Sequence, residues 1–308
     1  KKRFNSFYEV KAVRDFSIEV FEGENLGIIG ESGCGKSTLS RLISLLEKSD
    51  TGSISFDGED LSDLNKEKIK NFRQSLQLIL QDPYNSLPSR QTIGRIISEG
   101  LLIHSKLSKS DIKVKVLSTM KEVGINQDEY NKLLVGKSGS FRQRVSIARA
   151  LILEPKVIIL DETLSSLDQN EQEMFLSLFK KIQIKRNLTY IFISHDLAMV
   201  RKSCNRIAVM YMGRTVELAK NEILFKKCGH PYTRTLLSTI PTLDKNPYDK
   251  SIYLMDGEPP DPTAIGKGCS FNSRCPNPTQ ECKEGTIEMK LIEVQPGHWV
   301  DQCCVNCG

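Results

Sequence analysis

Three short apolar runs predict buried β-strands, and each run ends at polar or glycine-rich positions. They lie in "ENLGIIG", in "KVIILDE" from Val157 to Leu160, and in "LTYIFIS", which ends just before His195. Continuous apolar runs of this length are typical of central parallel strands covered on both faces. The pattern therefore predicts an α/β fold built on a parallel sheet.

Apolar residues at helical spacing predict helices between these strands. One helix follows the first strand, and its buried face is expected to contain Leu39, Leu42, Ile43 and Leu46. A crossover helix joins the second strand to the third, and its core face is expected to contain Met174, Phe175, Leu178, Phe179 and Ile182.

The remaining pattern predicts a mostly helical region and a strand pair. Residues 84–150 read as mostly helical, with Ser108 or Ser110 as a plausible helix cap in "SKSDIKVKVLSTMKEVG". Further on, "RIAVMYMGRTVEL" predicts two strands that turn at Gly213. After that the composition changes to the proline- and glycine-rich "GEPPDPTAIGKG", which predicts a loop.

Length and charge narrow the classes of protein to consider. A chain of 308 residues predicts about two domains, or one domain with an extension. The net charge of +5 is mild and spread along the chain, which argues against a nucleic-acid partner. No apolar stretch is long enough to span a membrane, and the start does not resemble a signal peptide. We therefore expect a cytosolic location, where clustered cysteines are metal ligands or redox groups more often than disulfides.

The turn after the first strand matches the phosphate-binding pattern G-x-x-x-x-G-K-[ST]. Its glycines let the backbone N–H groups converge on phosphate oxygens, and the helix that follows directs its positive end at the same anion. Lys36 is expected to reach the β- and γ-phosphates and the Ser37 hydroxyl to hold Mg²⁺. For Cys34 a small filler is a simpler role than redox chemistry. The expected nucleotide-binding residues are Gly30, Ser32, Gly33, Cys34, Gly35, Lys36, Ser37 and Thr38.

The other two strands end in residues suited to ATP hydrolysis. Asp161 is placed to hold the Mg²⁺ shell, and Glu162 to polarise a water for in-line attack on the γ-phosphate. His195 follows the third strand, and ligands bind at the carboxyl ends of parallel strands. A γ-phosphate contact is therefore its expected role.

The order of these motifs resembles the ATP-binding subunits of ABC transporters, specifically those of dipeptide/oligopeptide and nickel importers. The resemblance covers nearly the whole chain and includes "LQLILQDPYNSL", "SSLD" and "HPYTRTLLSTIP". It implies that Gln81 is the Q-loop glutamine, which senses the Mg²⁺ of the nucleotide, and that His195 is the switch histidine. It also implies that an aromatic residue stacks on adenine. Phe7 matches that position, with the neighbouring Tyr8 as a competitor and a buried structural aromatic as the alternative.

One motif departs from the family pattern. Where the family has Ser-Gly-Gly-Gln before "RQR", this chain has Ser138, Gly139, Ser140 and Phe141. In the family this signature begins a helix and closes the ATP bound to the opposite subunit, with Ser138 and Gly139 at the contacting positions here. If the second glycine position needs a positive φ, Ser140 costs roughly 1–2 kcal/mol there. Phe141 cannot replace the hydrogen bonds of a glutamine.

The altered signature suggests a heterodimer with one strong and one weak ATP site, although tolerated drift with two working sites remains open. The resemblance further implies a second ABC ATPase subunit, two transmembrane permease subunits and, indirectly, an extracytoplasmic peptide-binding protein. It places the chain as a peripheral protein at the cytoplasmic face of the membrane. Residues 84–150 correspond to the helical subdomain that docks on the membrane subunits.

The C-terminal part is rich in cysteine. Cys269, Cys275 and Cys282 precede "DQCCVNCG", and "GCSFNSRC" with "GHWV" resembles segments that bind a [4Fe–4S] cluster in some family members. The resemblance implies a fourth ligand, for which Cys303 is the nearest choice, with Cys304 and Cys307 as alternatives. Zinc, or cysteines without a metal, are the competing interpretations. Cys204 and Cys228 read as packing residues.

The sequence thus predicts an ABC-type P-loop nucleotide-binding domain over residues 1–228, with a RecA-like core and a helical subdomain. A small cysteine-rich domain is expected over residues 229–308. The predicted function is hydrolysis of Mg²⁺-ATP to drive peptide import. A nickel importer, or a soluble ABC ATPase not tied to transport, is the alternative.

Overall fold

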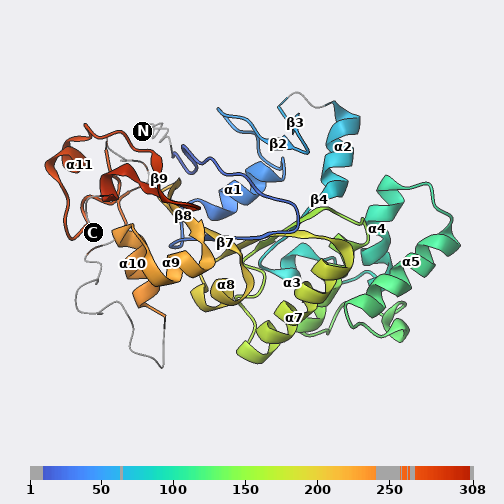
Figure 1. Ribbon diagram of the computed structural model, residues 1–308. Coiled ribbons are helices and arrows are strands. Elements are labelled where there is room, and N and C mark those ends of the chain that lie inside the picture. The colour runs from blue at the N-terminus through green and yellow to red at the C-terminus, as the bar shows by residue number, and fades with distance from the viewer. Residues whose placement is uncertain are drawn as a thin grey trace, which may run out of the picture. The chain divides into compact units, whose positions relative to one another are not determined.

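The structure is a computed structural model (Figure 1). Its described residues form two compact units. Unit 1 comprises Lys1–Glu19, Leu26–Leu39 and Ser194–Gly308, and unit 2 comprises Val20–Asn25 and Ser40–Ile193. Within these units the structure describes residues 10–62, 65–240, 257, 259–261, 263 and 268–305. The predicted domain boundary after residue 228 falls inside unit 1.

Unit 2 contains three parallel strands in the order β4, β5, β6. They are β4 (Leu76–Ile79), β5 (Val157–Asp161) and β6 (Thr189–Ser194), with Ile79 paired to Leu160 and Asp161 paired to Ile193. Strands β5 and β6 are the second and third apolar runs of the sequence, and almost all of their residues are buried. Parallel strands covered on both faces therefore explain those continuous apolar runs.

Helices fill residues 83–151 of unit 2. In α5 (Lys109–Glu122) the Ser108 side chain accepts a hydrogen bond from the Asp111 N–H at 3.2 Å, so Ser108 is the helix cap. Helices α4 and α5 pack on one another and on α6, and Figure 1 shows α4 beside α5. The other helical segments are α3 (Pro83–Ser86), α4 (Ile93–His104), η1 (Gln127–Glu129) and α6 (Gly139–Leu151).

The crossover helix of unit 2 is α7 (Gln169–Arg186), which joins β5 to β6. Asp168 caps it, and Phe175, Phe179 and Ile182 are buried as predicted. The prediction is wrong for Met174, which is 42% exposed. The buried stripe of a helix follows a spacing of three and four residues and is narrower than the set of five residues predicted for it, so Met174 at its margin faces solvent.

Unit 1 is built on a mixed sheet in the order β1, β7, β8, β10, β9. Strand β1 (Asn25–Ile29) is parallel to β7 (Arg206–Tyr211), and all other pairs are antiparallel. The predicted turn at Gly213 joins β7 to β8 (Arg214–Lys220). The hairpin of β9 (Leu291–Gln295) and β10 (His298–Asp301) pairs with β8, so these tail strands extend the sheet of the unit.

Helix α1 (Lys36–Ile43) follows β1 and crosses the division between the units. The prediction is wrong for Leu46, which is 57% exposed. The helix ends before it because Leu45 adopts a left-handed φ of 52°. The remaining helices of unit 1 are α8 (Leu197–Ser203), α9 (Asn221–Lys227), α10 (Pro231–Ser238), α11 (Gln280–Glu284) and η2 (Gln302–Cys304).

Three short elements of unit 2 complete the fold: β2 (Ser55–Phe56), β3 (Glu59–Asp60) and α2 (Lys66–Ser75). In the part of the chain that the structure describes, no helix is long and apolar enough to cross a membrane.

Candidate functional site

The phosphate loop follows β1 in unit 1 and is organised around Lys36. The Lys36 side chain is 4% exposed, and its Nζ donates to the Gly30 carbonyl at 2.7 Å and to the Glu31 carbonyl at 2.8 Å. The Cys34 N–H also donates to the Glu31 carbonyl, at 3.3 Å. These bonds hold the ammonium group inside the loop, where an anion bound by the loop would meet it.

Two glycines of this loop are required by its geometry. A Cβ added to Gly30 would lie 2.2 Å from the Met210 carbonyl oxygen. Gly35 has a φ of +106°, and a Cβ there would lie 2.1 Å from the Ala12 carbonyl oxygen. The glycines predicted from the motif therefore let the loop pack against neighbouring backbone as well as curl.

The other predicted phosphate-binding residues lie where the loop enters α1. Ser32, Gly33 and Ser37 are exposed, and Thr38 is half-buried. Ser37 and Thr38 belong to the first turn of α1, where the positive end of the helix dipole favours an anion. The first turn therefore suits a phosphate group.

Cys34 is a buried residue of the loop. Its Sγ lies 3.8 Å from the Lys36 Nζ. Burial raises the pKa of the Cys34 thiol, and the nearby lysine opposes that shift only in part. A thiol that resists ionisation is a poor nucleophile, so the structure favours packing over redox chemistry.

In unit 2, the predicted Gln81, Asp161 and Glu162 lie at the carboxyl ends of adjacent parallel strands. Gln81 is exposed and follows β4 by two residues, Asp161 ends β5, and Glu162 comes next. The Thr163 hydroxyl donates to the Ile79 carbonyl at 3.1 Å, which ties the segment after β5 to the end of β4. This edge is where parallel sheets bind ligands.

The two acidic residues differ in environment. Asp161 is buried, and its Oδ2 accepts a hydrogen bond from the Ser40 hydroxyl of α1 at 2.8 Å. Glu162 is half-buried and has a left-handed φ of 48°, with its N–H donated to the Ile193 carbonyl at 2.8 Å. Left-handed backbone at a residue other than glycine is unfavourable and concentrates at functional sites.

The segment after Glu162 leads into α7. The Ser165 hydroxyl donates to the Glu162 carbonyl at 2.8 Å, and the Asp168 side chain accepts from the Glu171 N–H at 2.9 Å. The "SSLD" segment is thus a turn closed on Glu162 that ends as a helix cap.

His195 is exposed and belongs to unit 1. It comes directly after β6 in the sequence. It is flanked by an ordered turn, because the Asp196 N–H donates to the Ser194 hydroxyl at 2.9 Å and the Asp196 side chain caps α8. Phe7 and Tyr8, the candidates for adenine stacking, lie outside the described residues. The predicted ATP-site residues are divided between the units, with the loop and His195 in unit 1 and Gln81, Asp161 and Glu162 in unit 2.

The altered signature begins α6 in unit 2. Ser138 is the helix cap, and its hydroxyl accepts from the Phe141 N–H at 3.3 Å. Ser140 is a helical residue and is not among the residues with positive φ, so the expected strain at this position is not incurred. The Lys137 Nζ lies 4.9 Å from the centre of the Phe141 ring. Ser140 and Phe141 therefore leave the helix start intact and change only the side chains that it presents.

The described cysteines of the tail gather in unit 1. Cys269, Cys282, Cys303 and Cys304 are buried and Cys275 is half-buried. The Cys269 N–H donates to the Cys282 carbonyl at 3.3 Å, and the Cys303 and Cys304 sulfurs lie 3.5 Å apart. Cys307 lies outside the described residues. Cys204 and Cys228 are also buried, as packing residues are.

The pKa values of Cys269 and Cys275 are raised by their surroundings. A hydrogen bond with Cys303 and then burial raise the pKa of Cys269, and burial followed by the proximity of Cys269 and Cys282 raises the pKa of Cys275. Within the described ranges, no three His, Cys, Asp or Glu side chains have an arrangement that could hold a metal ion.

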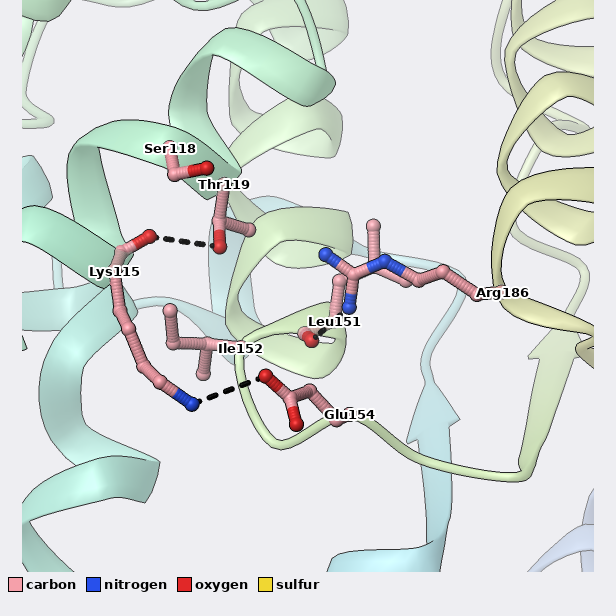
Figure 2. A pocket seen from close by; sticks show the side chains of 7 residues that line it. All are labelled: Lys115, Ser118, Thr119, Leu151, Ile152, Glu154 and Arg186. Carbon is pink, nitrogen blue, oxygen red and sulfur yellow. Dashed lines mark hydrogen bonds and ion pairs between the residues drawn. The ribbon is translucent and has the colours of Figure 1, made fainter.

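A cavity of about 90 Å³ lies in unit 2 (Figure 2). Its cations are already paired, because the Lys115 Nζ lies 3.0 Å from a Glu154 carboxylate oxygen and the Arg186 guanidinium binds Glu122 and the Leu151 carbonyl. Such a cavity offers little to a phosphate, so it is not a second nucleotide site.

Sequence reasoning missed two residues that contact the phosphate loop. The Arg274 guanidinium binds both carboxylate oxygens of Glu31, and the Tyr232 hydroxyl accepts from the Glu31 N–H. Both residues lie in segments that the sequence singles out, "HPYTRTLL" and "GCSFNSRC". Their spacing gave no sign of a contact with Glu31.

These features define a P-loop ATPase of the ABC type, and comparison with known proteins agrees. A profile of the ABC transporter family matches residues 13–165. The structure is similar to cbiO1 of Clostridium perfringens, part of the ABC transporter complex cbiONQ, with a TM-score of 0.64 and 30% identity, covering 70% of this chain and 84% of that one. It is also similar to the ATP-binding cassette MJ0796, a dimer bound to ADP and Pi, with a TM-score of 0.62 and 26% identity, covering 68% and 90% of the two chains.

The similarity extends to a narrower family within the ABC ATPases. A profile of the oligopeptide/dipeptide transporter C-terminal region matches residues 216–282. The chain is 41% identical to the oligopeptide transport ATP-binding protein AppF of Bacillus subtilis, covering 95% of this chain and 89% of that protein. It is 38% identical to the di/tripeptide transport ATP-binding protein DppF of Pseudomonas aeruginosa, covering 94% and 90%. The chain belongs to the ATP-binding subunits of oligopeptide/dipeptide ABC transporters and is an ATPase that energises transport.

Proposed function

We propose that this chain binds Mg²⁺-ATP at the loop of residues 30–38 and hydrolyses it to drive import of di- or oligopeptides. The observation that carries the proposal is the buried Lys36 ammonium, held by the Gly30 and Glu31 carbonyls inside a glycine loop at a helix start. That arrangement binds polyphosphates in P-loop proteins.

The other predicted ATP-site residues have chemistry suited to their proposed roles. The Ser37 hydroxyl, the Gln81 amide and the Asp161 carboxylate are hard oxygen donors of the kind that Mg²⁺ prefers. Bound Mg²⁺ neutralises charge that develops on the transferring phosphate. Glu162 would accept a proton from the attacking water, and His195 would contact the γ-phosphate.

Import implies partners beyond this chain. We propose that it works with a second ABC ATPase subunit and two transmembrane permease subunits at the cytoplasmic face of the membrane. An extracytoplasmic peptide-binding protein would deliver the substrate. The names of the AppF and DppF relatives support peptides as that substrate.

Uptake by the assembled transporter in sealed vesicles tests this proposal. Vesicles containing the two ATPase subunits and the permease subunits, with ATP inside and the peptide-binding protein outside, should accumulate a labelled dipeptide or oligopeptide. Uptake of nickel without uptake of peptide would replace peptide by nickel as the substrate. If the protein hydrolyses ATP but binds no permease, and no permease stimulates its activity, a soluble ABC ATPase would be favoured.

The signature supports a division of labour between two ATP sites. The start of α6 is intact, yet Ser140 adds a side chain and Phe141 adds a ring where the family presents glycine and glutamine. We propose that this chain pairs with a different ATPase subunit whose intact signature completes the site on Lys36 and Glu162. Ser138 and Gly139 would then close the partner's ATP only weakly.

A mixed dimer distinguishes the two sites. The Glu162→Gln variant of this chain, combined with an unchanged partner, should nearly abolish turnover. Removal of the corresponding glutamate from the partner should cost much less. Equal loss from both substitutions would show that the two sites contribute alike.

We further propose that the cysteine-rich part, predicted over residues 229–308, holds a [4Fe–4S] cluster through Cys269, Cys275, Cys282 and a fourth cysteine. The fourth ligand would be Cys303, with Cys304 and Cys307 as alternatives. The gathering of buried thiols in this part of the chain supports a metal site.

Metal analysis of protein purified without oxygen tests this second proposal. About four irons and four sulfides per chain, with broad visible absorption, would support the cluster. One zinc without colour would make the region a structural zinc module. Protein that lacks both metals would leave the cysteines as packing residues.

A further inference from the structure

Glu31, the second residue of the phosphate loop, is held by two side chains from the C-terminal part of unit 1. The Arg274 Nη1 and Nη2 donate to the two Glu31 carboxylate oxygens at 2.9 and 3.0 Å. The Tyr232 hydroxyl accepts from the Glu31 backbone N–H at 2.7 Å. Both the side chain and the backbone of Glu31 are therefore fixed from outside the loop.

Glu31 in turn organises the rest of the loop. Its carbonyl oxygen accepts from the Lys36 Nζ at 2.8 Å and from the Cys34 N–H at 3.3 Å. Displacement of Glu31 would therefore move an anchor of the lysine ammonium and the curl of the loop together. Because bidentate guanidinium–carboxylate pairs are strong and directional, Arg274 constrains that position closely.

Arg274 and Tyr232 are themselves rigidly placed. The Tyr232 ring lies 4.6 Å from the Tyr211 ring and 5.7 Å from the Phe271 ring, measured between centroids. The Arg274 N–H donates to the Phe271 carbonyl at 3.0 Å, and the Arg274 side chain is only 6% exposed. A buried aromatic cluster thus fixes both contacts on Glu31.

We propose that Arg274 and Tyr232 are positioning residues that set the nucleotide affinity of the phosphate loop. The inference rests on the proposed role of that loop in ATP binding. Through Arg274, the segment between Cys269 and Cys275 acts on the loop in addition to folding the tail. The competing explanation is that the ion pair only attaches the tail to the unit.

Nucleotide titration of the full-length chain tests the proposal. Arg274→Ala and Tyr232→Phe should each raise the Kd for ATP about tenfold, because each removes a strong bond that positions Glu31. Arg274→Lys keeps the charge without the bidentate fork, so it should recover only part of the affinity. Lys283→Ala removes an exposed cation of the same tail and should leave the Kd unchanged.

Two further measurements separate positioning from attachment. The Glu31→Gln, Arg274→Ala double variant should bind ATP no more weakly than the weaker single variant, because both remove one interaction. The Tm measured without nucleotide reports only how much each contact stabilises the attachment of the tail to the unit. Wild-type ATP affinity in Arg274→Ala and Tyr232→Phe, whether or not their Tm falls, would overturn the proposal. If the wild-type chain does not bind ATP, the proposed role of the loop fails first, and the positioning role fails with it.

Discussion

The phosphate loop and the altered signature each open a helix, but they depend on their residues in different ways. In the loop, Gly30 and Gly35 lie so close to neighbouring backbone that a Cβ at either would overlap a carbonyl oxygen at 2.2 or 2.1 Å. At the signature, a Cβ on Gly139 would lie 3.6 Å from the Tyr84 ring, which is an ordinary contact. Ser140 adopts a helical backbone there without strain.

This difference explains which departures from the family pattern a chain can tolerate. The loop needs its glycines for its own fold, so a change there would damage the unit itself. The start of α6 folds with serine and phenylalanine, so a change there affects only what α6 presents to a ligand. The altered signature is therefore compatible with a stable, ATP-binding subunit.

The largest effect is expected at the loop. Lys36→Ala removes the ammonium that donates to the Gly30 and Glu31 carbonyls and that we propose contacts the phosphates, so ATP hydrolysis by the assembled transporter should fall at least about 100-fold. The measurement is phosphate release at saturating ATP, with Lys283→Ala as the matched control. Retention of a tenth of the activity would contradict the role assigned to Lys36.

A large pH effect is expected in the region that supports the loop. His230 caps α10, which carries Tyr232, and its Nδ1 accepts from the Tyr232 N–H at 3.1 Å. Burial lowers the pKa of His230 from 6.5 to about 4, with Glu217 opposing the shift and Arg234 and Arg214 adding to it. The unfolded chain therefore binds more protons than the folded chain between these values.

The contribution of His230 to the free energy of unfolding is fully present above pH 6.5. It is lost as the pH falls toward 4, and the whole loss is about 3 kcal/mol. His230→Asn keeps a capping acceptor but does not titrate, so its unfolding free energy should fall less over this window. Denaturant titrations at pH 7, 5.5 and 4.5 check this. Parallel pH profiles for the two proteins would show that His230 does not titrate as described.

A matched pair of glycine substitutions compares the two helix starts directly. Gly35→Ala should lower the free energy of unfolding by about 2 kcal/mol or more, because φ is +106° and the Ala12 carbonyl blocks a Cβ. Gly139→Ala should stay within about 1 kcal/mol of wild type, because the position is helical and open. Equal losses in chemical denaturation would contradict the distinction between these regions.

The smallest effect is expected when the family signature is restored. Ser140→Gly with Phe141→Gln should raise turnover by the mixed dimer about twofold, because a second site would gain the donors that stabilise the γ-phosphate. Unfolding free energy should change by less than about 1 kcal/mol, since the backbone already permits both residues. Steady-state hydrolysis with the partner present is the measurement. Unchanged turnover would mean that both sites already work.

Local patterns explain why much of the fold could be predicted. The apolar runs of β1, β5 and β6 and the cap at Ser108 are encoded by adjacent residues. The errors at Leu46 and Met174 arise from what spacing omits, namely where a helix ends and how wide its buried stripe is. The addition of the tail hairpin to β8 could not be predicted, because strand pairing over long separations leaves no periodic signal.

The candidate site divides in the same way. The loop, Asp161 and Glu162 were found because their motifs are contiguous and their chemistry is explicit. The contacts of Arg274 and Tyr232 with Glu31 join residues 243 and 201 positions apart, and no spacing rule reports on such pairs. The absence of strain at Ser140 required the backbone conformation, which a family pattern does not contain.

The distance along the chain between Glu31 and Arg274 has a consequence during synthesis. The ribosome makes the phosphate loop early, yet Arg274 emerges 243 residues later. Tyr232 emerges 201 residues after Glu31, so the loop lacks both contacts at first and then lacks the arginine contact alone. Products that stop before Arg274 therefore carry an incompletely supported loop, and under the proposed positioning role full nucleotide affinity requires synthesis past Arg274.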